Sequence, residues 1–93
     1  MAILYKAASE RSREKVVRIL LEAGADVNAR GGEHGNALQA ASENGREKVV
    51  QMLLEAGANV NAQGGLSGNA PQAASMGGHE KVVQMLRDKM LSD

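Results

Sequence analysis

The chain contains no cysteine, no tryptophan and no phenylalanine, and Tyr5 is its only aromatic residue. Without cysteine there is no disulfide framework and no thiolate that could act as a nucleophile or a metal ligand. This absence fits an intracellular protein, and we expect the cytoplasm, or else the nucleus. With a single aromatic ring, the apolar core has to be built from Ala, Val, Leu, Ile and Met, which favours closely spaced helices.

An excess of charge of one sign is also missing, because 11 basic and 11 acidic residues give a formal net charge of zero. Such a chain has no electrostatic footprint for nucleic acid or for an anionic membrane surface. No run of apolar residues approaches a membrane-spanning length, and the N-terminal residues do not resemble a secretory signal. The hydrophobic fraction of 43% and the charged fraction of 24% are those of a folded soluble domain.

What the sequence does contain is an internal repeat. One tetrapeptide occurs three times, as Glu14-Lys15-Val16-Val17, Glu47-Lys48-Val49-Val50 and Glu80-Lys81-Val82-Val83. The period is 33 residues, since 47−14 and 80−47 both equal 33. A fixed period of this size indicates stacked supersecondary units.

Each unit is predicted to begin with a short helix. In the middle unit Asn36 can cap this helix, while Gln39, three residues later, closes a capping box. The helix should end near Asn44-Gly45, because glycine adopts the left-handed conformation at a helix end without a steric penalty.

A second helix and a finger complete the unit. The second helix is predicted from about Glu47 to Ala56, with one buried face that consists of Val49, Val50, Leu53 and Leu54. The following residues, 58–65, alternate in polarity and end in Gly64-Gly65. This pattern predicts an extended finger with a tight reversal at its tip.

The pattern resembles the ankyrin repeat, a unit of two helices and a hairpin-like finger. The resemblance rests most clearly on residues 54–62, Leu-Glu-Ala-Gly-Ala-Asn-Val-Asn-Ala, and on the inter-helix turn at Asn44-Gly45, and it extends from about Ala2 to Leu91. It implies an all-α fold, an α-solenoid of three stacked helix pairs. We therefore predict a single domain over residues 1–93, with repeats at approximately 2–34, 35–67 and 68–93.

Two departures from the family pattern affect contacts between units. Where the family usually has Thr-Pro-Leu-His, this chain has residues 36–39, Asn-Ala-Leu-Gln, and residues 69–72, Asn-Ala-Pro-Gln. The residues of the family's hydrogen-bond network between repeats are therefore replaced, although Asn and Gln can still close the cap locally. This variant, together with the Gly-Gly finger tip, is similar to repeats of large fungal ankyrin arrays.

The last unit ends differently from the middle one. Arg87 stands where the middle unit has Leu54, and Lys89 and Met90 replace Ala56 and Gly57. Terminal units of solenoids need polar outer faces, so these changes are typical of a capping unit. Because such arrays are often longer than three units, a trimmed segment of a longer array or an engineered protein is an equally good interpretation.

Candidates for catalytic chemistry are few. His34 falls in a finger and His79 at the inter-helix turn, where the family often carries a histidine, so a structural role is favoured for His79. The glycine pairs lack the Lys and Ser/Thr of a phosphate-binding loop. We therefore predict no catalytic residue, no metal site and no cofactor, and an enzyme is the least favoured class.

The resemblance implies a non-catalytic module that binds a partner protein. In this family the contact surface is the concave face, formed by finger tips and first helices. Seven residues at matching positions vary from unit to unit while the residues around them repeat: Arg30, Glu33, Glu43, Asn44, Gln63, Leu66 and Met76. None is a Trp or Tyr anchor, so we expect weak affinity. The alternative is a structural, self-associating segment of a larger regulatory or signalling protein. We expect a monomer with weak end-to-end association, and neither nucleic acid nor a membrane as partner.

Overall fold

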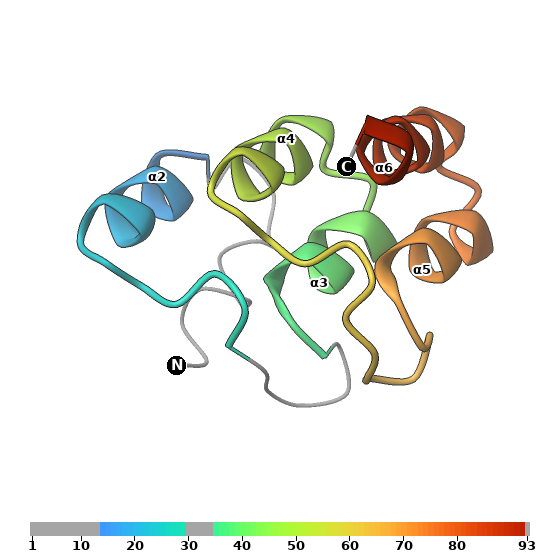
Figure 1. The fold of residues 1–93 in the computed structure, drawn as a ribbon, viewed down its shortest axis with the longest axis horizontal. Coiled ribbons are helices and arrows are strands. Elements are labelled where there is room, and N and C mark those ends of the chain that lie inside the picture. Colours follow the sequence, from blue (N-terminus) through green and yellow to red (C-terminus); the bar gives the residue numbers. More distant parts are fainter. Residues whose placement is uncertain (1–13, 30–34, 93) are drawn as a thin grey trace.

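The second helices of successive units lie side by side in one layer, and the first helices lie in a layer beneath them (Figure 1). The computed structural model describes residues 14–29 and 35–92. Five helices occur in these ranges, namely α2 (Glu14–Glu22), α3 (Ala37–Glu43), α4 (Glu47–Glu55), α5 (Ala70–Met76) and α6 (Glu80–Ser92). No strand occurs there, so the predicted all-α solenoid is confirmed for these ranges.

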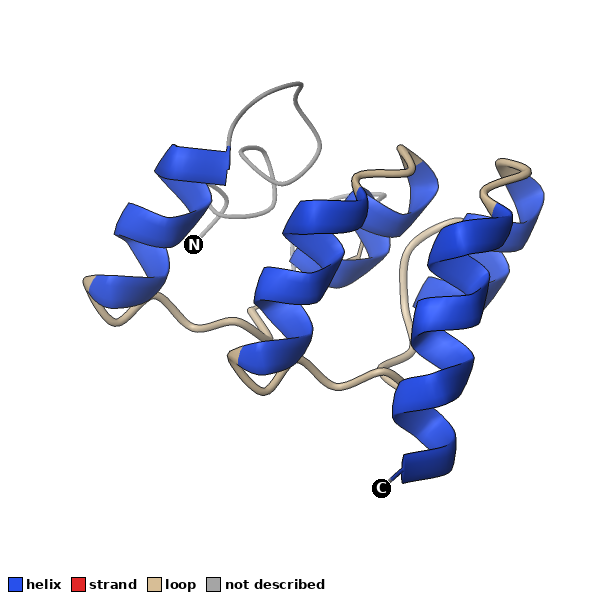
Figure 2. Ribbon diagram, turned by 90° about the horizontal axis from the view of Figure 1, so that it is seen from above, coloured by secondary structure: helices blue, strands red, loops and turns tan. Residues whose placement is uncertain are grey.

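The layer of α2, α4 and α6 is seen most directly from above, where the three helices run in nearly the same direction (Figure 2). Their apolar stripes face α3 and α5 and one another. In α4 the side chains of Val49, Val50 and Leu53 are buried. Leu54, predicted to share this face, is half-buried: it packs against the core and also lines an outer groove with Met85. At about 100° per residue, Leu54 lies about 140° around the helix from Val49, at the margin of the stripe.

The capping box predicted for the first helix of the middle unit is confirmed. The Asn36 side chain accepts a hydrogen bond from the Gln39 amide, and the Gln39 side chain accepts one from the Asn36 amide, both at 2.9 Å. The helix ends at Glu43, and Gly45 follows with a φ of 68°. Both ends of α3 are therefore determined locally, by a cap and a glycine.

The finger differs in part from its prediction. Its tip does reverse at the two glycines, where the Gly64 amide donates to the Gly68 carbonyl at 2.8 Å. The residues before the tip were predicted to be extended, but they contain a turn at residues 60–61. The Asn59 side chain accepts a hydrogen bond from the Asn61 amide at 2.9 Å, and this local bond favours a turn over a strand.

The last helix is longer than its counterpart, with 13 residues in α6 and 9 in α4. After α4 the chain turns away at Gly57, whose φ of 93° disfavours any residue with a side chain. Met90 occupies this position in α6, and Lys89 precedes it. Both are good helix formers, so the helix continues to Ser92 where the middle unit has a finger.

A polar contact between the middle unit and the last lies at the inter-helix turn, where the His79 ring nitrogen Nε2 is 3.1 Å from the Glu43 carbonyl oxygen. The ring sits against two glycines, because a Cβ atom at Gly45 would lie 2.5 Å from Nδ1 and one at Gly77 would lie 2.7 Å from Cδ2. A structural role for His79, as the sequence predicts, agrees with this position.

Within the middle unit, the capping box also supports the finger. While its oxygen closes the cap, the Gln39 side chain donates through Nε2 to the Gly64 carbonyl in the finger of the same unit, at 2.8 Å. One side chain thus joins the start of α3 to the finger that ends the unit.

Replacing Gln39 by alanine should therefore destabilise the chain by about 1–2 kcal/mol, because the buried Asn36 amide and the half-buried Gly64 carbonyl lose their partner. Gln39 is buried, whereas its counterpart Gln72 is exposed and accepts no cap bond. Gln72→Ala is the matched control and should change the free energy of unfolding by no more than about 0.5 kcal/mol. Urea denaturation measures both, and equal effects for the two variants would contradict the role of Gln39 in joining α3 to the finger.

Candidate functional site

The predicted contact residues in the described ranges fall into two groups. Glu43 and Met76 are the last residues of α3 and α5, and Asn44 follows α3. The two helix ends are adjacent, since a Cβ atom at Gly77 would lie 3.0 Å from the Glu43 carbonyl oxygen. The structure therefore brings Glu43, Asn44 and Met76 together at the inter-helix turns.

Asn44 differs from the other two members of this group. Its side chain is half-buried, and Nδ2 donates to the Ala40 carbonyl within α3 at 2.8 Å. Glu43 and Met76 are exposed, Met76 at 69%. Asn44 thus stabilises the end of α3, whereas Glu43 and Met76 are exposed residues at the ends of their helices.

The second group lies on the finger. Gln63 is exposed, and Leu66 is 81% exposed although it is fully apolar. The finger that carries them is held at its tip by the Gly64 to Gly68 bond and from the side by Gln39. Leu66 is therefore an exposed apolar side chain on a well-supported loop.

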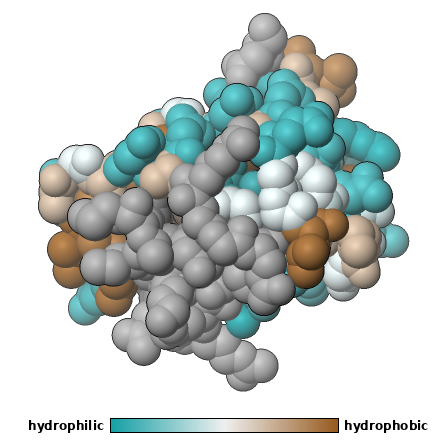
Figure 3. All heavy atoms as spheres, turned by 90° about the horizontal axis from the view of Figure 1, so that it is seen from below, coloured by the Kyte–Doolittle hydropathy of each residue, from teal (hydrophilic) through white to brown (hydrophobic). Residues whose placement is uncertain are grey.

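The two groups are separated by the length of a first helix. The helix α5, which follows the finger and ends at Met76, has 7 residues and so spans about 10 Å at 1.5 Å per residue. The face with the finger tips is seen from below in Figure 3, where polar and near-neutral atoms dominate the described residues and apolar atoms occur in small separate areas. Such a surface suits an extended contact with a protein better than a single enclosed pocket.

Two predicted contact residues, Arg30 and Glu33, lie outside the described residues, and so does His34. Within the described ranges no group of three or more His, Cys, Asp or Glu residues could hold a metal ion. No helix in those ranges is long and apolar enough to cross a membrane.

A comparison with protein families decides the identity of the chain. A family model described as ankyrin repeats in three copies matches residues 1–64. The chain belongs to the ankyrin-repeat family. A comparison with curated proteins gives no significant match.

The ankyrin fold continues beyond the matched residues. α5 and α6 repeat the arrangement of α3 and α4, with Asn69 capping α5 through a 2.8 Å bond from the Gln72 amide as Asn36 caps α3. Ankyrin repeats are generally protein-interaction modules, and the family is typically non-catalytic. The general function therefore follows from family membership.

The sequence indicates Gln39 as a cap residue and His79 as a structural residue, but it does not predict their distant partners. The bond from Gln39 to the finger of its own unit and the contact of His79 with Glu43 both join residues at least 25 positions apart. The sequence shows only that Gln39 has a counterpart in the next unit, Gln72, so this position belongs to the repeated pattern. It does not show which carbonyl the amide reaches.

Proposed function

We propose that this ankyrin array binds a partner protein through its concave face, formed by the finger tips and the first helices. The observation that carries the proposal is the exposure of Leu66 and Met76 on supported elements. Exposed apolar side chains are stabilised by burial, at about 25 cal/mol for each Å² removed from water. Because their backbone positions are already ordered, little conformational entropy would be lost on binding.

The polar residues of the two groups support a protein as the partner. Glu43 belongs to the same group at the inter-helix turns as Met76, and Gln63 lies on the same finger as Leu66, so both can supply polar contacts at the rim of an interface. The neutral chain favours neither nucleic acid nor an anionic membrane. With two apolar anchors and no aromatic one among the described positions, the expected affinity is modest.

A pair of triple variants tests the face. The first, Gln63→Lys with Leu66→Ser and Met76→Ser, changes the finger and the first helix. The second, Lys48→Glu with Glu55→Lys and Lys81→Ser, changes exposed residues of α4 and α6 and serves as the matched control.

Both triple variants should fold, because exposed substitutions away from caps usually change stability by no more than about 0.5 kcal/mol each. Immobilised wild type and both variants are compared for the proteins they retain, identified by mass spectrometry. We expect a partner retained by wild type and by the α4 and α6 variant, and lost from the finger variant. The reverse result would place the contact on the second helices and contradict the proposal.

A further inference from the structure

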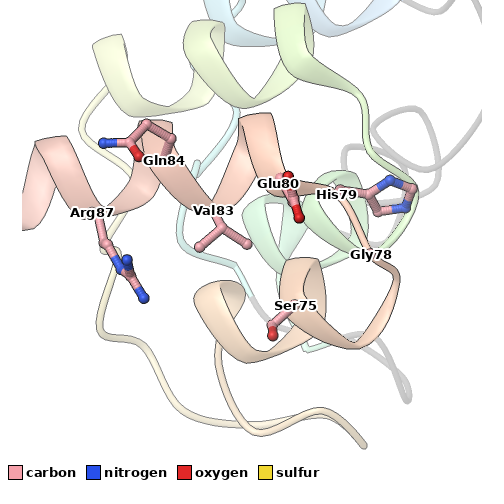
Figure 4. Close-up of a pocket in the computed structure, with 7 residues that line it drawn as sticks. All are labelled: Ser75, Gly78, His79, Glu80, Val83, Gln84 and Arg87. Carbon is pink, nitrogen blue, oxygen red and sulfur yellow. The ribbon is translucent and has the colours of Figure 1, made fainter.

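The outer face of the last unit repeats the positions with which the middle unit binds its neighbour. In the middle unit Ser42 and Val50 are fully buried. Their counterparts are Ser75, which is exposed, and Val83, which is half-buried. Both line an open groove together with Gly78, His79, Glu80, Gln84 and Arg87 (Figure 4).

The α2 helix carries the complementary feature at the opposite end of the layer. Ile19 is 62% exposed, whereas its counterparts Met52 and Met85 are half-buried. Each methionine lines a groove against the preceding second helix, Met52 beside Leu21 and Met85 beside Leu54. Ile19 is thus an apolar side chain at a position that elsewhere contacts a neighbouring unit.

The repeat period indicates how these two faces would meet. In the groove between α2 and α4, Leu21 and Glu55 lie on opposite sides. The residue at the position of Leu21 in the last unit is Arg87, and the residue at the position of Glu55 in the first unit is Glu22. If the same packing continued from the last unit onto the first unit of a second copy, Arg87 would face Glu22.

A second charge pair follows from the groove between α4 and α6. Glu47 and Lys81 line opposite sides of that groove. At a junction between copies these positions are occupied by Glu80 and Lys15, which have the same two charges. Arg87 and Glu22 add a pair of opposite charges at positions where an internal junction has a leucine and a carboxylate. The same grooves also place like charges together, Lys81 with Lys15 and Asp88 with Glu22, as the internal junctions do with Lys48 and Lys81 and with Glu22 and Glu55. The pair of Arg87 and Glu22 is therefore the charge contact that distinguishes this junction.

We propose that the outer face of α6, in the groove it forms with α5, binds α2 of a second copy of this chain, head to tail, in the packing that joins α4 to α6 within one chain. The contact covers Ile19 and pairs Arg87 with Glu22 and Glu80 with Lys15 of the second copy. It uses two different faces, so it is heterologous and can add further copies. Because exposed ion pairs contribute little free energy, the association is weak and is reduced by salt. It does not depend on the concave face proposed above.

Sedimentation velocity on the 93-residue chain at low ionic strength, from about 10 μM to 1 mM, tests the contact. We expect a monomer at the low end and a rising sedimentation coefficient at the high end. Arg87→Glu and Glu22→Arg should each weaken the association by about tenfold, and the double variant should regain it. A mixture of the two single variants should also associate, since each keeps one intact face. Gln63→Arg on the finger is the control and should behave as wild type.

Three results would overturn the proposal. One is a wild-type chain that remains monomeric throughout the concentration range. Another is an association that the two single charge reversals leave unchanged, or that Gln63→Arg reduces as strongly. The third is a mixture of the single variants that fails to associate, because such a mixture restores the pair of Arg87 and Glu22 between unlike chains.

Discussion

Replacing Leu53 by alanine should lower the free energy of unfolding by about 2–5 kcal/mol, the range for removing a large aliphatic side chain from a packed core. Leu53 is fully buried in α4, the second helix of the middle unit. This helix packs against α2 on one side, α6 on the other and α3 beneath. A cavity at Leu53 therefore weakens the unit that connects the two others.

The size of this effect matters because small domains are stable by only about 5–15 kcal/mol. Units of a solenoid contact only their neighbours, so loss of the middle unit also removes support from both ends. Thermal and urea denaturation followed by circular dichroism measure the change. Leu66→Ala, at an 81% exposed position, is the control and should leave the midpoint nearly unchanged. Equal midpoints for Leu53→Ala and wild type would contradict the observed packing of α4.

Replacing Gly45 by alanine should cost about 2–3 kcal/mol for two separate reasons. Its φ of 68° lies in the left-handed region, where a side chain costs about 1–2 kcal/mol. In addition, the new Cβ would lie 2.5 Å from Nδ1 of His79, so the ring has to move from its place beside the Glu43 carbonyl. The loss of that hydrogen bond adds about 1 kcal/mol.

Gly78 offers a matched control for this prediction. It occupies the equivalent turn of the last unit, with a φ of 73°, and no heavy atom lies within 4 Å of an added Cβ. Gly78→Ala should therefore show the backbone cost alone and destabilise less than Gly45→Ala. A double variant, Gly45→Ala with His79→Ala, should be destabilised by less than the sum of the two single variants, because the added Cβ no longer meets the His79 ring. If Gly78→Ala costs as much as Gly45→Ala, the contact with His79 has no energetic role.

Much of the fold was predictable because each unit contains its own local signals. Asn36 and Gln39 are three residues apart and cap a helix whatever lies beyond it. Gly45 and Gly57 end their helices through their own backbone preference. The all-α class, the helix boundaries to within about a residue and the family were correct for these reasons.

For the predicted binding residues, the sequence said less about exposure and contacts than it did about the helices. The structure places Glu43 and Met76 together and leaves Leu66 exposed on a supported finger, which the sequence alone could not distinguish from a buried leucine. Asn44 was selected for its variation between units, yet its side chain bonds within α3. Variation between units identifies positions that the repeated fold does not require. The exposure of a side chain and its local hydrogen bonds decide what it can contact.

By itself, the sequence determined the period of the array, the helices within each unit and the residues that start and end them, because these depend on interactions between residues a few positions apart. Only the tertiary structure decided how the finger meets its own helices and how one unit meets the next. The bond of Gln39 to the finger depends on how the finger packs beside α3 of its own unit. The position of His79 beside Gly45 and Gly77 and the partial burial of Leu54 depend on the register between units. That register is set by the packing of whole apolar faces, a property that no short segment contains.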